Sequence, residues 1–207
     1  MIQIERTSVM NLEGAIRGAR NPMNSWAKSD SYYDENGQFV LGPVDLDFGH
    51  RLAVSGSDHR KFLRQVFVTV DITAPLYWWK EFDTYKVGTV ANSCSTMHKI
   101  HAKAFDRDDF SHDRLDEGGL ALLDATVAYL EAERQKFISN KEDRQPWHNM
   151  IQMLPSSYNQ MRTVTLNYEN LINMYYARKT HKLAEWHTYC DWIESLPYAK
   201  ELILVRD

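Results

Sequence analysis

The stretch "DHRKFLRQVFVTVDITAP", residues 58–75, decides the fold class of this chain. Aliphatic residues alternate through its centre with residues of other kinds, which is the period-two pattern of a strand with one buried face. Proline 75 then suits the first turn of a helix over residues 75–87, with a break predicted near Gly88. The side chains predicted to face the core from this strand are Val66, Val68, Val70 and Ile72.

Further elements are predicted on both sides of this stretch. Residues 1–6 alternate as a short strand, and residues 12–20 favour a helix. Residues 21–45 are rich in Pro, Asn, Ser and Gly, which predicts a long loop of the kind that often serves in binding. Residues 167–195 favour one long helical run. Its packing candidates are Leu171, Met174, Tyr175, Leu183 and Trp186.

Residues 114–139 have the pattern of an amphipathic helix, because apolar side chains recur there at helical spacing. The predicted buried face holds Leu120, Leu123, Val127, Leu130 and Phe137. The predicted water-facing side includes Glu131, Glu133, Arg134 and Lys136.

The bulk composition predicts one compact domain over residues 1–207, since 43% of the residues are hydrophobic and 12% are aromatic. A net charge of −4 with mixed signs argues against a nucleic-acid polymer as partner. No stretch approaches the roughly 20 apolar residues that cross a bilayer, so no membrane partner is expected. Two unpaired-looking cysteines, Cys94 and Cys190, fit a reducing compartment, and we expect a cytoplasmic protein.

Single polar residues leave several interpretations open. His98 and His101 are three apart, and His181 and His187 lie further on, but no spacing supplies a third ligand, so no metal site is predicted. Ser95 is either a nucleophile or the cap of a turn. Arg178 is either an ion-pair partner or a phosphate clamp.

An aromatic group follows the predicted strand. It suits the core or an oligomer interface, and the sharper interpretation is a stacking platform for a flavin or a base. Its members are Tyr77, Trp78, Trp79, Phe82 and Tyr85.

Three segments of the chain hold characteristic residues in a particular order and spacing. After the first stretch, with His59, Thr69, Ala74 and Pro75, comes "YKVGTVANSCSTMH" at residues 85–98, which holds Asn92 and Ser95. The segment "LPSSYNQMRTVTLNYENLINMYYAR" at residues 154–178 holds Leu154, Pro155, Thr165, Asn167, Leu171, Asn173 and Arg178. In order and spacing, these residues resemble the signatures of the flavin-dependent thymidylate synthases, over most of residues 50–195.

The resemblance implies a fold and a set of roles. The family fold is α+β, an antiparallel sheet with long helices, assembled as a homotetramer that holds FAD between subunits. Catalytic roles carry over to Ser95 and Arg178. Cofactor-binding roles are expected at His59, Lys61, Lys86, Asn92, Asn167 and Asn173.

Several basic positions of the family are changed here. The Arg-His-Arg triplet of the family is Tyr85-Lys86-Val87, and family arginines are replaced by Met97, Ile151 and Glu169. Each lost arginine removes a charge-assisted hydrogen bond of about 1.5–3 kcal/mol. Phosphate binding is therefore expected to be altered, with Lys86 and the basic cluster Arg60, Lys61 and Arg64 as substitute charges.

The resemblance leaves more than one function open. The first is an FAD-dependent enzyme acting on a pyrimidine nucleotide, by methylation of deoxyuridylate (dUMP) or a related modification. NADPH and methylenetetrahydrofolate take part only if the family reaction is retained. The second is a non-catalytic homologue that binds a nucleotide or a protein, since a scaffold does not carry function by itself. The third is a structural oligomer without a small ligand.

Overall fold

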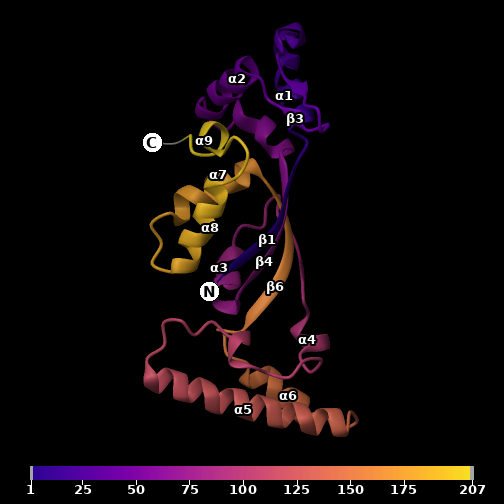
Figure 1. Ribbon diagram of the computed structural model, residues 1–207, viewed down its shortest axis with the longest axis vertical. Helices are drawn as coiled ribbons and strands as arrows, with labels where there is room; N and C mark the ends of the chain where they lie inside the picture. Colours follow the sequence, from indigo (N-terminus) through magenta and orange to yellow (C-terminus); the bar gives the residue numbers. More distant parts are fainter. Residues whose placement is uncertain (1, 206–207) are drawn as a thin grey trace. The chain divides into compact units, whose positions relative to one another are not determined.

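The computed structural model describes residues 2–205 (Figure 1). Their contacts divide them into two compact units. Unit 1 comprises residues 2–3, 72–84 and 92–162, and unit 2 comprises residues 4–71, 85–91 and 163–205. The assignment of residues 1–207 to one domain stays a prediction, and residues 1, 206 and 207 lie outside the described residues.

A four-stranded antiparallel sheet has the strand order β1-β4-β6-β5. Its strands are β1 (Gln3–Met10), β4 (Phe67–Pro75), β5 (Val90–Ser93) and β6 (Asn159–Asn167). The predicted core face of β4 is confirmed, because the side chains of Val68, Val70 and Ile72, and of Val66 just before the strand, are fully buried. Each such burial contributes about 1.5–3 kcal/mol to folding. The α+β class is therefore confirmed.

Helix α3 (Leu76–Phe82) follows β4 directly, with Pro75 as its N-cap. It ends at Phe82, not near Gly88 as predicted. Trp78, Trp79 and Phe82 are buried, and the Trp79 indole N–H donates to the backbone oxygen of Gln160 at 2.8 Å. These three rings belong to the core, which supports the simpler interpretation of the aromatic group.

Unit 1 also contains a helical layer built from α5 (Glu117–Ser139) and α6 (Gln145–Met153), which lie side by side in Figure 1. Short segments α4 (Thr96–Lys99) and η4 (Arg107–Asp109) precede it. The predicted apolar face of α5 is largely confirmed. The cluster that it forms includes Phe110, Leu123, Leu130, Phe137 and Met150.

Glu133 on α5 was predicted to face water, but it is only 4% exposed. Its carboxylate accepts hydrogen bonds from the Lys136 ammonium at 2.5 Å and from the Asn149 amide of α6 at 2.7 Å. These two bonds lower the pKa of Glu133 against the effect of burial. The periodicity missed this position because a paired carboxylate is stable where an unpaired one is not.

The N-terminal part of unit 2 contains more structure than the loop predicted for residues 21–45. Helix α1 (Leu12–Ala19) is followed by η1 (Asn21–Met23), η2 (Trp26–Lys28), a hairpin of β2 (Tyr32–Tyr33) and β3 (Phe39–Val40), α2 (Pro43–Val54) and η3 (Arg60–Gln65). The Asp34 carboxylate closes the hairpin by accepting from the backbone N–H groups of Asn36 and Gln38. The loop prediction was wrong because Asp and Gly, which are common in irregular loops, also form the tight turn that joins two short strands into a hairpin.

A buried ion pair fixes this segment in place. Arg20 and Asp45 are 3% and 0% exposed, and their charged groups lie 2.5 Å apart. Burial alone would raise the Asp45 pKa, but hydrogen bonds from Ser29, Ser31 and Arg20 outweigh it and lower that pKa. The loop between α1 and α2 is therefore pinned to the core of unit 2.

The C-terminal part of unit 2 contains α7 (Tyr168–Arg178), α8 (Ala184–Glu194) and α9 (Ala199–Leu202). The single run predicted for residues 167–195 was wrong, because a turn separates α7 from α8. The imidazole Nδ1 of His181 accepts the backbone N–H of Leu183 at 3.2 Å, which stabilises this turn. Of the packing candidates, Leu171, Met174 and Trp186 are fully buried. Within residues 2–205, no helix is both long and apolar enough to span a bilayer.

Candidate functional site

Arg178 ends α7 between two aromatic side chains of unit 2. Its Nε donates to the Tyr85 hydroxyl at 2.8 Å, and its guanidinium carbon lies 4.6 Å from the Trp186 ring centroid. The Tyr85 ring centroid is 5.4 Å from the same carbon. Stacking and a hydrogen bond together fix the plane of a guanidinium. Arg178 is therefore oriented before any ligand arrives.

Asn167 caps α7 and is 7% exposed. Its side-chain oxygen accepts from the Asn170 backbone N–H at 3.0 Å, while the Asn170 side-chain oxygen accepts from the Asn167 N–H at 3.2 Å. The Asn170 amide also donates to the Val87 backbone oxygen at 2.7 Å. Asn170 thus holds the loop at residues 85–88 against the start of α7, and Asn167 holds Asn170 in place.

Asn92 and Ser95 belong to unit 1. Asn92 is exposed on β5, and Ser95 is the N-cap of α4, with its hydroxyl accepting from the His98 backbone N–H at 3.1 Å. In the part of the chain that the structure describes, no imidazole or carboxylate hydrogen-bonds to this hydroxyl. The structure therefore gives Ser95 a capping role, and a chemical role for it stays a prediction.

Two other predicted ligand-binding residues lie on exposed parts of unit 2. Lys86 follows Tyr85 in the loop, and Asn173 lies on the exposed side of α7, five residues before Arg178. Lys86 makes no ion pair within residues 2–205. Both side chains are accessible to a ligand.

A pocket of about 820 Å³ lies in unit 2 and holds two more predicted residues, His59 and Lys61. It is formed where η3 meets α2 and the end of α1. Phe48 and Phe62 line it with apolar surface, while Arg64 adds a second cation. Its volume is in the range of pockets that take cofactors, roughly 300–1,000 Å³.

Glu169 changes the charge of this basic cluster. It is the residue at a position where the resemblance expects an arginine, and its carboxylate binds both Arg64 and Arg60, the latter at 3.5 Å. Two of the four expected substitute charges, Arg60 and Arg64, are therefore paired with a carboxylate. Lys61 forms no ion pair with any described residue, so its charge remains available to a ligand.

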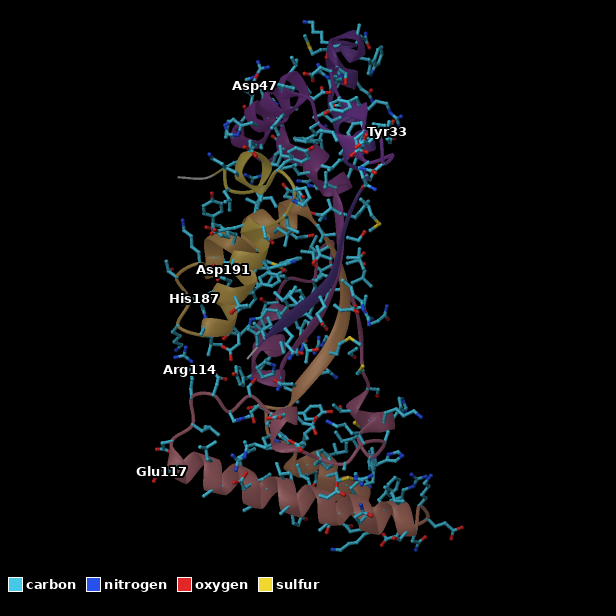
Figure 2. All side chains as sticks on the ribbon, in the orientation of Figure 1. Tyr33, Asp47, Arg114, Glu117, His187 and Asp191 are labelled. Carbon is cyan, nitrogen blue, oxygen red and sulfur yellow. The ribbon has the colours of Figure 1, made fainter. Side chains whose placement is uncertain are left out.

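His181 and His187 both take part in the turn between α7 and α8. His187 is labelled on α8 in Figure 2. Its Nε2 donates to the backbone oxygen of His181 at 2.6 Å, and this contact stabilises the turn between α7 and α8. Among residues 2–205, no three His, Cys, Asp or Glu side chains are arranged to hold a metal ion.

Sequence reasoning missed the partners of the predicted residues. Tyr85 was noted as the loss of an arginine, yet it supplies the hydroxyl that holds Arg178. Trp186 was expected to pack and also stacks on that guanidinium. Phe48 and Phe62 carry no local motif, so only their place in the fold identifies them as pocket walls.

Comparison with solved structures identifies the same fold over the whole chain. Thymidylate synthase X (ThyX) of Helicobacter pylori, crystallised with FAD and dUMP, is 16% identical with a TM-score of 0.70, and the match covers 100% of both chains. Another crystal structure of that enzyme, also with FAD and dUMP, is 17% identical with a TM-score of 0.68 and covers 97% of each chain. The UMP/dUMP methylase PolB from Streptomyces cacaoi, bound with 5-Br dUMP, is 13% identical with a TM-score of 0.66 and covers 99% of this chain and 95% of its own.

The sequence itself matches no protein-family model and no curated protein. At such low identity, the structural likeness establishes the fold and not the activity. The predicted resemblance to the flavin-dependent thymidylate synthases is thereby confirmed for the fold.

Proposed function

We propose that this protein is a flavin-dependent enzyme that acts on a pyrimidine nucleotide and binds its phosphate in an altered way. The observation that carries the proposal is the full-length likeness to ThyX, whose crystal structure contains FAD and dUMP. The likeness to a UMP/dUMP methylase points to the same substrate class. Methylation of dUMP, or a related modification, is the reaction that this pair of neighbours favours.

The pocket of unit 2 has the properties that part of an FAD molecule needs. A pyrophosphate needs cations and hydrogen-bond donors, which Lys61 and His59 offer. A flat ring system needs apolar walls, which Phe48 and Phe62 offer. FAD bound there would supply the redox chemistry, and the protein would supply binding and orientation.

The nucleotide would be held by the polar residues of the family signatures. Arg178, fixed by Tyr85 and Trp186, would present a planar donor to a pyrimidine ring. Asn173 is exposed on the same helix and would add an amide. Lys86 would give the phosphate a single charge where an arginine-rich triplet would give more. Asn92 and Ser95 belong to unit 1, and their ligand-binding roles stay predictions from the resemblance, while Asn167 acts through the cap of α7.

The remaining expectations depend on how much of the family reaction is retained. NADPH and methylenetetrahydrofolate take part only if a carbon unit is transferred to dUMP. A homotetramer and a cytoplasmic location also belong to the proposal.

A non-catalytic homologue is the second candidate, and two observations favour it. The Glu169 carboxylate engages both Arg60 and Arg64, and the Ser95 hydroxyl already accepts a backbone hydrogen bond. Both features reduce what the site can do to a substrate while leaving the fold intact. Such a protein would still bind a nucleotide or a protein partner without turning it over.

Visible absorption of the purified protein tests the proposal. We expect two flavin bands, either as purified or after added FAD has been taken up and free FAD removed. We then expect dUMP to perturb those bands, because the nucleotide would lie against the flavin. A protein that stays colourless after incubation with FAD would overturn the proposal. Flavin bands that do not respond to dUMP at about millimolar concentration would overturn the substrate class.

A further inference from the structure

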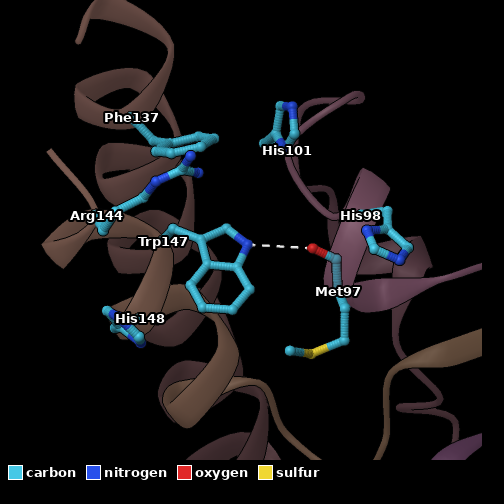
Figure 3. A pocket seen from close by; sticks show the side chains of 7 residues that line it. All are labelled: Met97, His98, His101, Phe137, Arg144, Trp147 and His148. Carbon is cyan, nitrogen blue, oxygen red and sulfur yellow. Dashed lines mark hydrogen bonds between the residues drawn. The ribbon is translucent and has the colours of Figure 1, made fainter. Parts of the chain in front are cut away.

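Unit 1 contains a second pocket, of about 530 Å³, between the α4 region and helices α5 and α6 (Figure 3). Its size is that of a small-molecule site, roughly 300–1,000 Å³. None of the residues assigned above to a flavin or nucleotide lines it. The lining residues are Met97, His98, His101, Phe137, Arg144, Trp147 and His148.

The polar lining of this pocket consists of nitrogen-bearing side chains, without a carboxylate. The Arg144 guanidinium makes no ion pair or hydrogen bond with another described residue, and its central carbon lies 5.9 Å from the centroid of the Phe137 ring. Burial lowers the pKa of His101, and the nearby positive charges of Lys141, Lys99 and Arg134 act in the same direction. The lining therefore carries the positive charge of Arg144 and no negative charge, which favours an anion.

One buried atom of the pocket has no partner. Nδ1 of His101 is shielded from solvent and accepts or donates no hydrogen bond within residues 2–205. Buried polar atoms are nearly always paired with protein, water or ligand.

The apolar side of the pocket is held rigidly. The Trp147 indole N–H donates to the Met97 backbone oxygen at 3.2 Å, the dashed line in Figure 3, so the helix carrying Trp147 and the α4 segment fix its ring. The His101 ring meets Phe137 edge-on, with centroids 5.0 Å apart. Fixed aromatic rings beside unpaired nitrogen donors suit a flat ring that carries a negative group.

We propose that this pocket binds a small aromatic phosphate, with Arg144 and His101 taking the phosphate and Trp147 packing against the ring. A phosphate suits two such donors better than a carboxylate does, because its three terminal oxygens accept from several directions. The proposal rests on unit 1 alone and does not depend on FAD binding.

Phenyl phosphate is the probe that tests this proposal. It is titrated into the 207-residue protein, and binding is measured by calorimetry and by the imidazole signals of the histidines in NMR spectra. We expect saturable binding that shifts the His101 signal. Arg144→Gln should weaken binding roughly tenfold or more, because it removes the charged donor. Arg114→Gln is the matched control, since Arg114 is an exposed arginine of unit 1 outside the pocket, and it should bind as the unchanged protein does.

Three results would overturn the proposal. These are no binding at about 10 mM probe, equal losses in the two variants, and binding without any change at His101. Inorganic phosphate and phenol, titrated separately, should each bind more weakly than phenyl phosphate. If inorganic phosphate binds as well, the role of Trp147 is refuted. Protein that takes up no FAD but binds phenyl phosphate here would contradict the proposed function and leave this inference standing.

Discussion

Lys61 and Arg64 line the same pocket of unit 2 with the same formal charge, but Glu169 binds only the second of these two. The difference makes them a test of where FAD binds. Lys61→Gln should weaken FAD binding roughly tenfold, because an available cation is lost from the pyrophosphate. Arg64→Gln should weaken it by roughly threefold or less, since the Arg64 guanidinium is already held by the Glu169 carboxylate.

Flavin fluorescence quenching, measured at several FAD concentrations, gives both dissociation constants. The two variants remove the same charge from the same pocket, so each controls for the other. A larger loss in Arg64→Gln than in Lys61→Gln would show that Glu169 moves away when FAD binds, which would refute the fixed pairing seen here.

Candidate site residues could be selected from the sequence, whereas the side chains that contact them could not. The spacing of Asn167, Asn173 and Arg178 was sufficient to select them. However, the Tyr85 hydroxyl reaches Arg178 across 93 residues, and no local pattern predicts such a contact. Glu133 was placed in water for the same reason, because its Asn149 partner lies on another helix.

At the scale of elements, the strand β4 and the helix α5 were predictable because burial imposes their periods of two and 3.6 residues. The break between α7 and α8 was not. Residues 179–183 contain no Gly or Pro, and the turn depends on a hydrogen bond to the His181 ring. The hairpin in residues 32–40 was missed although Asp34 and Gly37 are turn residues, since very short strands show too little alternation to detect.

Gly88 tests how tightly the loop at residues 85–88 is held against α7. Its φ is +74°, and a Cβ there would lie 3.0 Å from the amide groups of both Asn167 and Asn170. Gly37 has nearly the same φ, +73°, with nothing within 4 Å of the added carbon. Gly37→Ala should therefore lower the free energy of unfolding by about 1 kcal/mol, the cost of the left-handed conformation alone.

Gly88→Ala should lower the free energy of unfolding by about 1 kcal/mol more than Gly37→Ala does, because the capping asparagines cannot move without losing hydrogen bonds. Urea denaturation of the two variants measures the difference. Equal losses would mean that the loop gives way freely and that the asparagine contacts do not hold it.

At the scale of the whole molecule, α5 leaves an apolar stripe uncovered. Leu122 is 70% exposed and Tyr129 is 41% exposed, with exposed alanines at 125 and 132 beside them at helical spacing. A row of exposed apolar side chains on one helix face is typical of a protein–protein contact. The expected homotetramer would bury this stripe against another copy of the chain.

Light scattering during gel filtration should then give a mass of four 24.2 kDa chains for the unchanged protein. Leu122→Glu should lower that mass, because a carboxylate buried in an apolar contact destabilises it by several kcal/mol. Gln152→Glu adds the same charge at an exposed position on α6, outside the α5 stripe, so it should keep the mass unchanged. A single-chain mass for the unchanged protein, or the same drop in both variants, would refute the α5 stripe as the contact between copies.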